Sequence, residues 1–80
     1  MKTIYADKYR QIGLKIAYYR KLRGLTQEQL AERLELSPAF IGHVEAPNIN
    51  KAVSLDTLFD VAAALAVSYT HLTLPTSDLV

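Results

Sequence analysis

The chain has 80 residues, of which 50% are hydrophobic, a formal net charge of +1 and no cysteine. A chain of this length suits one small domain with a modest core, and the lack of cysteine excludes both a disulfide framework and a thiolate metal site. No apolar run approaches the roughly 20 residues that span a bilayer, and the N-terminus has no signal-peptide core. We therefore expect a soluble, cytoplasmic protein with no membrane contact.

The basic residues are concentrated in the first third of the chain. Seven of the nine precede Gly24, and Asp7 is the only acidic residue in that stretch. Such an asymmetry indicates either a surface that meets a polyanion or the solvated face of a helix. Charge alone leaves both interpretations open.

The first predicted helix runs from Asp7, which we expect to cap it, to about Arg23. Gly24 follows as a residue that readily adopts the left-handed conformation at which helices end. Apolar residues at helical spacing predict the face that enters the core. They are Ile12, Ile16 and Tyr19.

The same helix carries a second apolar stripe. Leu14, Tyr18 and Leu22 recur every four residues, roughly 200° around the axis from the first stripe, although a surface helix needs only one. We expect the second stripe to pack on a later helix. A contact with a second chain is the alternative.

Residues 26–45, TQEQLAERLELSPAFIGHVE, contain start signals for two short helices. Thr26 followed by Gln29 makes a capping box, and Ser37 followed by Pro38 is a cap with proline at the first helical position. Two caps eleven residues apart leave only a short hinge around Glu35. This spacing is typical of a helix-turn-helix, whose second helix is free to lie in the major groove of DNA.

Apolar side chains of this segment fall where its two helices would touch. Ala31 lies at the expected crossing point, where a larger side chain would push the helices apart. The other contact residues are Leu30, Leu34, Leu36, Ile41 and Val44.

A loop over residues 46–53 and a further helix follow. Pro47 and two asparagines predict the loop. Ser54 is expected to cap the helix, with Asp56 in its positively polarised first turn. Its apolar residues should close the core over the central helix pair. They are Leu55, Leu58, Val61, Ala62 and Leu65.

Residues 67–80 are expected to form a poorly structured tail, so the predicted domain covers residues 7–66. Threonines and Pro75 give the tail poor helix propensity and no sustained period. The run VSYTHLTLPT also resembles the conceptual translation of a sequencing-library adapter. In that case the native sequence would end before about Val67 and the tail would carry no functional information.

From Ile12 to about Val67 the chain resembles the Cro/C1-type (XRE-like) helix-turn-helix family of phage and bacterial repressors. The matching residues are IGLKIAYYRKLRGLTQEQLAERLELSPAFIGHVE (12–45) and SLDTLFDVAAALAV (54–67). The resemblance implies an all-α, compact, lambda-repressor-like bundle of four to five helices around a central helix-turn-helix. It also implies a sequence-specific regulator of transcription, a repressor, which binds double-stranded DNA through a helix at residues 38–45.

The family also implies roles for three polar residues. Gln27 matches the glutamine that begins the second helix and contacts a phosphate; the alternative is a solvated first-turn residue. Arg20 and Glu45 match a pair that fixes the recognition helix against the first helix and directs the guanidinium toward the DNA backbone. A pair of this kind on the surface would contribute at most about 1 kcal/mol, so its main effect would be orientation.

The start and outer face of the third helix should meet the bases. The expected base-reading residues are Ser37, Pro38, Ala39, Gly42 and His43, with Phe40 near the phosphate-facing edge. These side chains are short or apolar compared with the arginine, glutamine and asparagine that read bases bidentately. His43 is the only polar reader of that face, unless it is exposed without a partner. Discrimination should then be modest or depend on DNA shape.

Two positions depart from the family pattern. Glu35 replaces the glycine expected in the turn between the central helices, at a cost of about 1 kcal/mol in the left-handed region. After Glu45 the chain continues Ala46-Pro47-Asn48 instead of a basic or amide residue and glycine. Asn48 or Lys51 would then supply the phosphate contact.

Other functional classes receive less support from the residues. His43 and His71 are far apart, and no cysteine, glycine-rich phosphate loop or acid-rich cluster supplies a nucleophile or a metal cage. Asp56 and Asp60 fit a solvated helix face. We therefore expect no enzyme activity, no cofactor and no metal.

Two assemblies are expected. A homodimer would place two copies on DNA half-sites about 34 Å apart, because one copy of this size makes few contacts. The alternative function is a protein-interaction module, such as an antitoxin that binds its toxin through Leu14, Tyr18 and Leu22, since the fold alone does not decide function.

Overall fold

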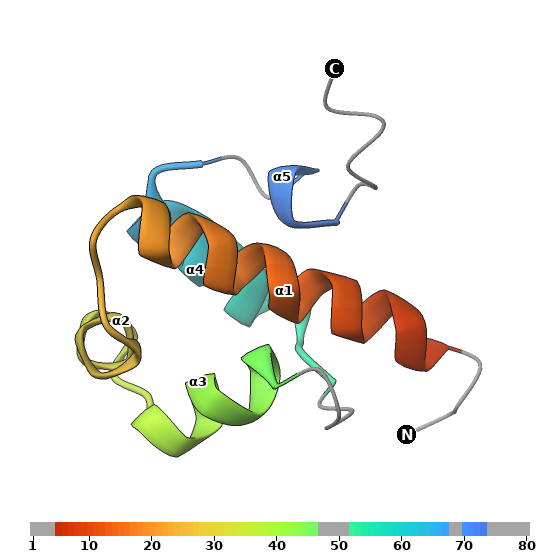
Figure 1. Cartoon of the computed structure of the whole chain (residues 1–80), viewed down its shortest axis with the longest axis horizontal. Helices are drawn as coiled ribbons and strands as arrows, with labels where there is room; N and C mark the ends of the chain where they lie inside the picture. The colour runs from red at the N-terminus through yellow and green to blue at the C-terminus, as the bar shows by residue number, and fades with distance from the viewer. Residues whose placement is uncertain (1–4, 47–51, 68–69, 74–80) are drawn as a thin grey trace.

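The computed structural model describes residues 5–46, 52–67 and 70–73, and these pack as an all-α bundle (Figure 1). In chain order the helices are α1 (Ala6–Leu22), α2 (Gln27–Leu34), α3 (Pro38–Glu45), α4 (Leu55–Leu65) and α5 (Thr70–Thr73). The fold class expected from the sequence is confirmed. Within the described ranges, no helix is both long and apolar enough to cross a membrane.

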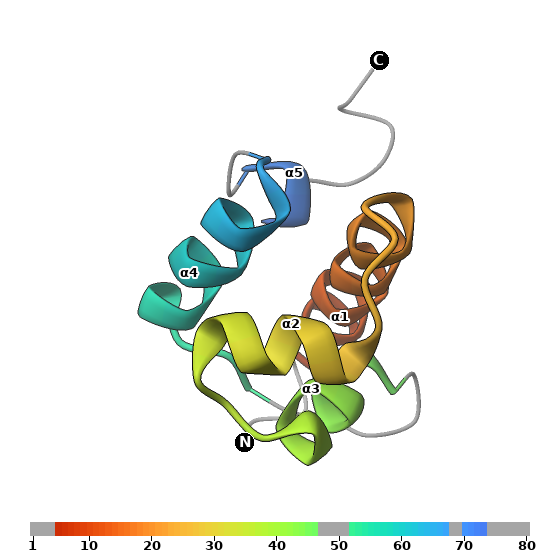
Figure 2. The same ribbon diagram turned by 90° about the vertical axis from the view of Figure 1, so that its left-hand side faces the viewer.

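Two helices, α1 and α4, form opposite walls of the bundle, and α2 and α3 close one end (Figure 2). α3 packs on both α1 and α2, while α2 also packs on α4. α5 packs against α1, on the side away from α3 (Figure 1). This arrangement leaves α3 at the edge of the bundle.

The ends of α1 agree only in part with the sequence analysis. Gly24 has a φ of 72°, so it forms the left-handed stop that was predicted. At the other end the N-cap is Tyr5, which provides no side-chain cap. Asp7 lies inside the first turn and pairs with Arg10 at 2.7 Å. Its predicted capping role is therefore wrong, although an acid in the first turn still favours the positive end of the helix.

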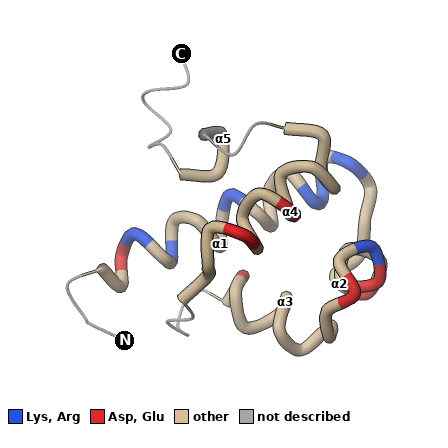
Figure 3. The backbone as a smooth tube through the Cα atoms, turned by 180° about the vertical axis from the view of Figure 1, so that it is seen from behind, with Lys and Arg blue, Asp and Glu red and all other residues tan. Residues whose placement is uncertain are grey.

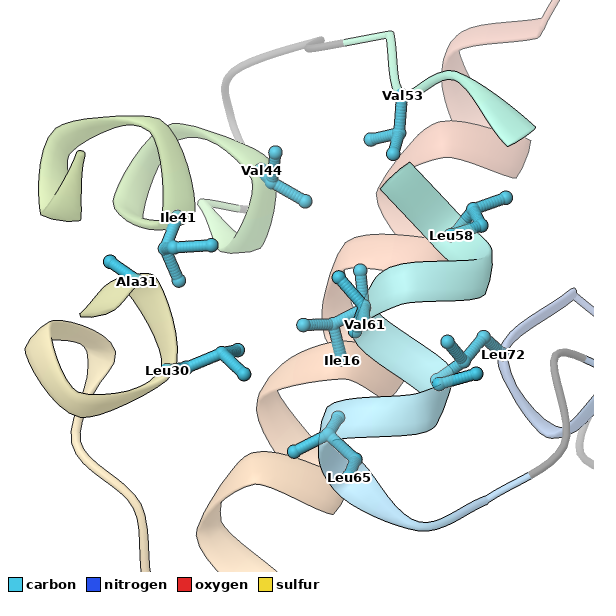
Figure 4. Close-up of a cluster of buried hydrophobic side chains, with 11 residues drawn as sticks. Ile16, Leu30, Ala31, Ile41, Val44, Val53, Leu58, Val61, Leu65 and Leu72 are labelled. Atoms are coloured by element: carbon cyan, nitrogen blue, oxygen red, sulfur yellow. The ribbon is translucent and has the colours of Figure 1, made fainter. Parts of the chain in front are cut away.

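The core lies between the two walls and the helix-turn-helix (Figure 4). Ile16 of α1 belongs to one cluster with residues of α2, α3 and α4, and Ile12 and Tyr19 pack against this cluster as predicted. Burial of one such aliphatic side chain contributes about 1.5–3 kcal/mol. The central members are Ile16, Leu30, Ala31, Ile41, Val44, Leu58, Val61, Ala62 and Leu65.

Several apolar residues lie outside the core, contrary to expectation. Leu55, in the first turn of α4, is 63% exposed. Leu36, in the turn after α2, is also exposed. The second stripe of α1 is not buried under a later helix, because its three members are all about half exposed or more. The helical period correctly placed these side chains on one stripe, but it does not state whether a neighbour covers it.

The structure differs from the expected tail at residues 70–73. These form the single turn α5, and Leu72 is fully buried in the core. One apolar residue between threonines gives no helical period, so its burial left no signal in the sequence. Residues 68–69 and 74–80 of the predicted tail, and most of the predicted loop, 47–51, lie outside the described residues.

Candidate nucleic-acid interface

The turn between α2 and α3 is built from local backbone signals. Thr26 Oγ1 accepts from the Gln29 N–H at 3.0 Å, and Gln29 Oε1 accepts from the Thr26 N–H at 2.8 Å, which completes the predicted capping box. α2 ends at Leu34, and its C-cap Glu35 has a φ of 56° and a ψ of 39°, which are left-handed. The Leu36 N–H then donates to the Ala31 carbonyl at 2.9 Å. The chain thus reverses in the few residues that the cap spacing allowed, with glutamate in a conformation that glycine adopts more easily.

α3 begins at the predicted serine-proline step. Ser37 Oγ accepts from the Phe40 N–H at 3.1 Å, and Pro38 occupies the first helical position. Fully buried Ala31 lets α2 and α3 approach closely. Ile41 and Val44 point into the core, so the opposite side of α3 faces outward.

The C-terminal end of α3 is held against α1 by a buried ion pair. Arg20 donates through Nε to Glu45 Oε2 at 2.7 Å and through Nη2 to Glu45 Oε1 at 2.9 Å. Its third nitrogen, Nη1, donates to the Leu25 carbonyl at 2.7 Å. Both charged residues are only 7% exposed. The pair is therefore not the surface pair considered in the sequence analysis, and loss of one partner would leave a buried charge.

Gln27 joins the same cluster from the start of α2. Its Nε2 donates to Glu45 Oε1 at 2.9 Å, so the Glu45 carboxylate links α1, α2 and α3. The side chain is partly exposed, and an amide nitrogen has a second proton to donate. Spacing alone did not reveal this bond, because residues 27 and 45 are brought together only by the turn.

Gly13 provides the close approach between α1 and α3. A Cβ at this position would overlap the Val44 carbonyl oxygen and would lie 3.0 Å from the Val44 carbonyl carbon. Both are backbone atoms that no rotamer change can move. Gly13 and the Arg20–Glu45 pair thus fix the same end of α3, and the sequence analysis missed this glycine because it sits inside a regular helical pattern.

The residues predicted to read bases share the outer side of α3. Ser37, Pro38, Ala39 and His43 are exposed, while Gly42 and Phe40 are partly buried. An added Cβ at Gly42 would meet only Gln27 Oε1, at 3.5 Å. The structure brings these residues together on one surface, whereas Asn48 and Lys51 lie outside the described residues.

The distribution of charge differs from a simple basic interface (Figure 3). Arg20 bonds within the fold, as does Arg23, whose Nε donates to the Leu65 carbonyl at 2.7 Å. Arg10 pairs with Asp7. Much of the N-terminal basic character therefore serves the fold. The exposed charged residues of α2 are two glutamates and one arginine, namely Glu28, Glu32 and Arg33.

The helix-turn-helix family HTH_3 matches residues 16–72. An uncharacterised HTH-type transcriptional regulator, y4dJ, of Sinorhizobium fredii is 33% identical over 90% of this chain and 91% of its own. The immunity repressor protein of Bacillus phage phi105 is 43% identical over 70% of this chain, which spans only 38% of that repressor.

The fold of this chain is also similar to that of a solved structure. The restriction-modification controller protein C.AhdI from Aeromonas hydrophila superimposes with a TM-score of 0.75 at 32% identity, over 85% of this chain and 98% of its own. The family match at residues 16–72 includes Arg20, α2, α3 and Glu45. This chain belongs to the HTH_3 helix-turn-helix family.

Proposed function

We propose that this chain is a DNA-binding transcriptional regulator that inserts α3 into the major groove of double-stranded DNA and acts as a repressor. The observation that carries the proposal is the geometry of α3. Its inner side is fixed to α1 and α2 by Glu45, and its outer side presents exposed Ser37, Pro38, Ala39 and His43. A rigid helix with a bare outer face is what major-groove insertion requires.

Gln27 is proposed to contact a phosphate beside the start of α2. The positive helix end and the second amide proton both favour an anion there. The bond to Glu45 would hold the amide in a defined orientation. Arg20 instead acts through Glu45, because its nitrogens already bond within the protein and little of its surface is exposed. Phe40, Asn48 and Lys51 remain candidates for the flanking backbone.

Sequence preference would come from few direct contacts. Ala39 offers a methyl group that can pack on thymine, and Gly42 permits close approach of the helix backbone. His43 is the one side chain of this face that can hydrogen-bond a base edge through its ring nitrogens. We therefore expect discrimination at one or two base pairs per copy, supplemented by DNA shape.

The protein is proposed to bind as a homodimer on two half-sites, because one copy offers few phosphate and base contacts. The relatives support regulation of transcription: one is named an HTH-type transcriptional regulator and another an immunity repressor. The exposed stripe of α1 supports a second candidate, a surface for another protein chain.

A pair of matched variants tests the proposal. Ala39→Glu places a negative charge on the outer face of α3, and Ala63→Glu places the same charge at an exposed position of α4. Titration of a random pool of short duplexes at low ionic strength should show binding by the wild type and by Ala63→Glu. Ala39→Glu should bind at least about tenfold more weakly, because a carboxylate carried into the groove is repelled by the negatively charged DNA.

The salt dependence gives an independent reading. Binding should weaken steeply as salt is added, since each neutralised phosphate contributes a slope of about −0.9 in log K against log salt. Equal loss of binding in the Ala39→Glu and Ala63→Glu variants would contradict a specific role of α3. Absence of wild-type binding at low ionic strength would contradict DNA binding itself.

A further inference from the structure

The outward side of α1 combines apolar and basic side chains. Leu14, Tyr18 and Leu22 are 47%, 60% and 58% exposed. Lys15 and Lys21 border this stripe on its two sides, as the helical repeat requires. We call these five residues the α1 face.

The outward side of α4 has the complementary composition. Leu55 is 63% exposed and Phe59 is 47% exposed, one turn apart along the helix. Asp56 and Asp60 are exposed beside them, with the same one-turn spacing. We call these four residues the α4 face.

The aspartates of the α4 face point away from the α1 face across the bundle, whereas Leu55 lies nearer to α1, since it lines a pocket with Tyr9 and Ile12. Residues 14 and 18 lie two positions on either side of buried Ile16, and residues 56 and 60 lie two positions on either side of buried Leu58. Each pair is therefore about 200° around its helix from the core side. Because α1 and α4 form opposite walls, the α1 face and the outer part of the α4 face lie on opposite sides of the molecule (Figure 2).

We propose that the α4 face of one copy docks on the α1 face of a second copy, head to tail. The contact sets Leu55 and Phe59 against the apolar stripe and brings Asp56 and Asp60, which share one edge of the α4 face, to a lysine at the edge of that stripe. Pairing of like faces is disfavoured, because lysine would meet lysine or aspartate would meet aspartate. A second copy is the occupant because this chain itself carries both halves of the complementary pair.

The symmetry of this contact has a consequence for assembly. An interface between two different faces is heterologous, so it extends into a row of copies unless the rotation closes a ring. A two-fold dimer across DNA half-sites needs a different surface. α3 lies at the end of the bundle between the two walls, so the contact leaves its outer side uncovered (Figure 2). On the proposed function, neighbouring copies would bind adjacent DNA sites cooperatively.

The test uses the absence of cysteine from the chain, and it needs no DNA. Tyr18→Cys places one thiol on the α1 face, and Leu55→Cys places one on the α4 face. The two variants are mixed in a glutathione redox buffer, and the mixed disulfide is followed on non-reducing gels. Leu14→Cys with Phe59→Cys is the second pair. In the control reaction, Glu32→Cys, at an exposed position of α2, takes the place of the α4 variant.

We expect the mixed disulfide to form at least about tenfold faster than the control disulfide, because docking raises the effective concentration of the two thiols. Asp56→Lys with Asp60→Lys in the Leu55→Cys chain should slow it, and Lys15→Glu with Lys21→Glu in the other chain should restore it. Circular dichroism establishes that each variant is folded.

Formation of the mixed disulfide no faster than the control would overturn the proposal. Faster crosslinking of Tyr18→Cys with itself would also overturn it, because it would show that two α1 faces meet. Either result leaves the DNA titration unaffected, so failure of this contact and failure of the proposed function are distinguishable.

Discussion

Gly13 and Gly42 are both glycines inside helices, yet alanine should have opposite effects at the two positions. Alanine normally stabilises a helix interior by about 0.5–1 kcal/mol relative to glycine. At Gly42 the new methyl group would meet only Gln27 Oε1, at an ordinary 3.5 Å. Gly42→Ala should therefore raise the free energy of unfolding by up to about 1 kcal/mol.

At Gly13 the same methyl group would overlap the backbone of Val44. The Val44 carbonyl carbon, 3.0 Å from the added Cβ, must retreat, and the carbonyl oxygen must retreat further. Overpacking of this kind costs about 1–3 kcal/mol, and backbone cannot relax as a side chain can. With the helix-propensity gain included, Gly13→Ala should lower the free energy of unfolding by about 2 kcal/mol.

Urea and thermal unfolding followed by circular dichroism compares the two variants. A difference of about 3 kcal/mol separates their melting temperatures by more than about 10 °C in a domain of this size. If Gly13→Ala is as stable as Gly42→Ala, then α1 and α3 are not in close backbone contact. The account of how α3 is fixed would then be wrong.

Four further predictions concern the central helices. Glu45→Ala should cost about 3–5 kcal/mol in urea unfolding, because it leaves the Arg20 guanidinium buried without its partner; replacing both residues by apolar ones should recover most of this. Glu35→Gly should raise the free energy of unfolding by about 1 kcal/mol in the same assay. A lower free energy of unfolding would show that glutamate is not strained in this left-handed turn. Gln27→Ala should weaken binding to all duplexes by a similar factor in titrations, whereas a changed sequence preference would contradict a phosphate role. His43→Ala should change the preferred base at one position per half-site in selection from random duplexes, and an unchanged motif would remove it as a reader.

Local signals predicted the helix-turn-helix well. The capping box at Thr26, the serine-proline step at Ser37 and the stop at Gly24 each depend on a few neighbouring residues, and each appears in the structure. Ser54 likewise caps α4, where its Oγ accepts from the Thr57 N–H at 3.2 Å. Such signals can be read from the sequence because the backbone groups that they satisfy lie within one turn.

Features that depend on distant parts of the chain were less predictable. The period of α1 placed Leu14 and Tyr18 on one stripe, but their exposure depends on which helix packs where. Leu55 has core spacing, yet it sits in the first turn of α4 and is 63% exposed. The need for glycine at position 13 appears only once Val44 is placed against it.

The candidate site shows the same division. The family resemblance supplied the Arg20–Glu45 pair, but only the structure shows that it is buried and joined by Gln27. The charge pattern suggested a basic first helix, and the structure shows that Arg20 and Arg23 bond within the fold. The charge of a sequence counts the ionisable residues, but it does not reveal which of them bond within the fold.

The central claim is that the outer face of α3 enters the major groove. Amide chemical shifts recorded during titration with a selected duplex test it most directly, because each residue reports its own surroundings. We predict the largest changes at four residues of the α3 segment and a smaller change at Gln27. The four are Ser37, Ala39, Gly42 and His43. On a duplex with a single binding site, Tyr18 should change little. Changes concentrated on α1 or α4, with residues 37–43 unaffected, would contradict the account.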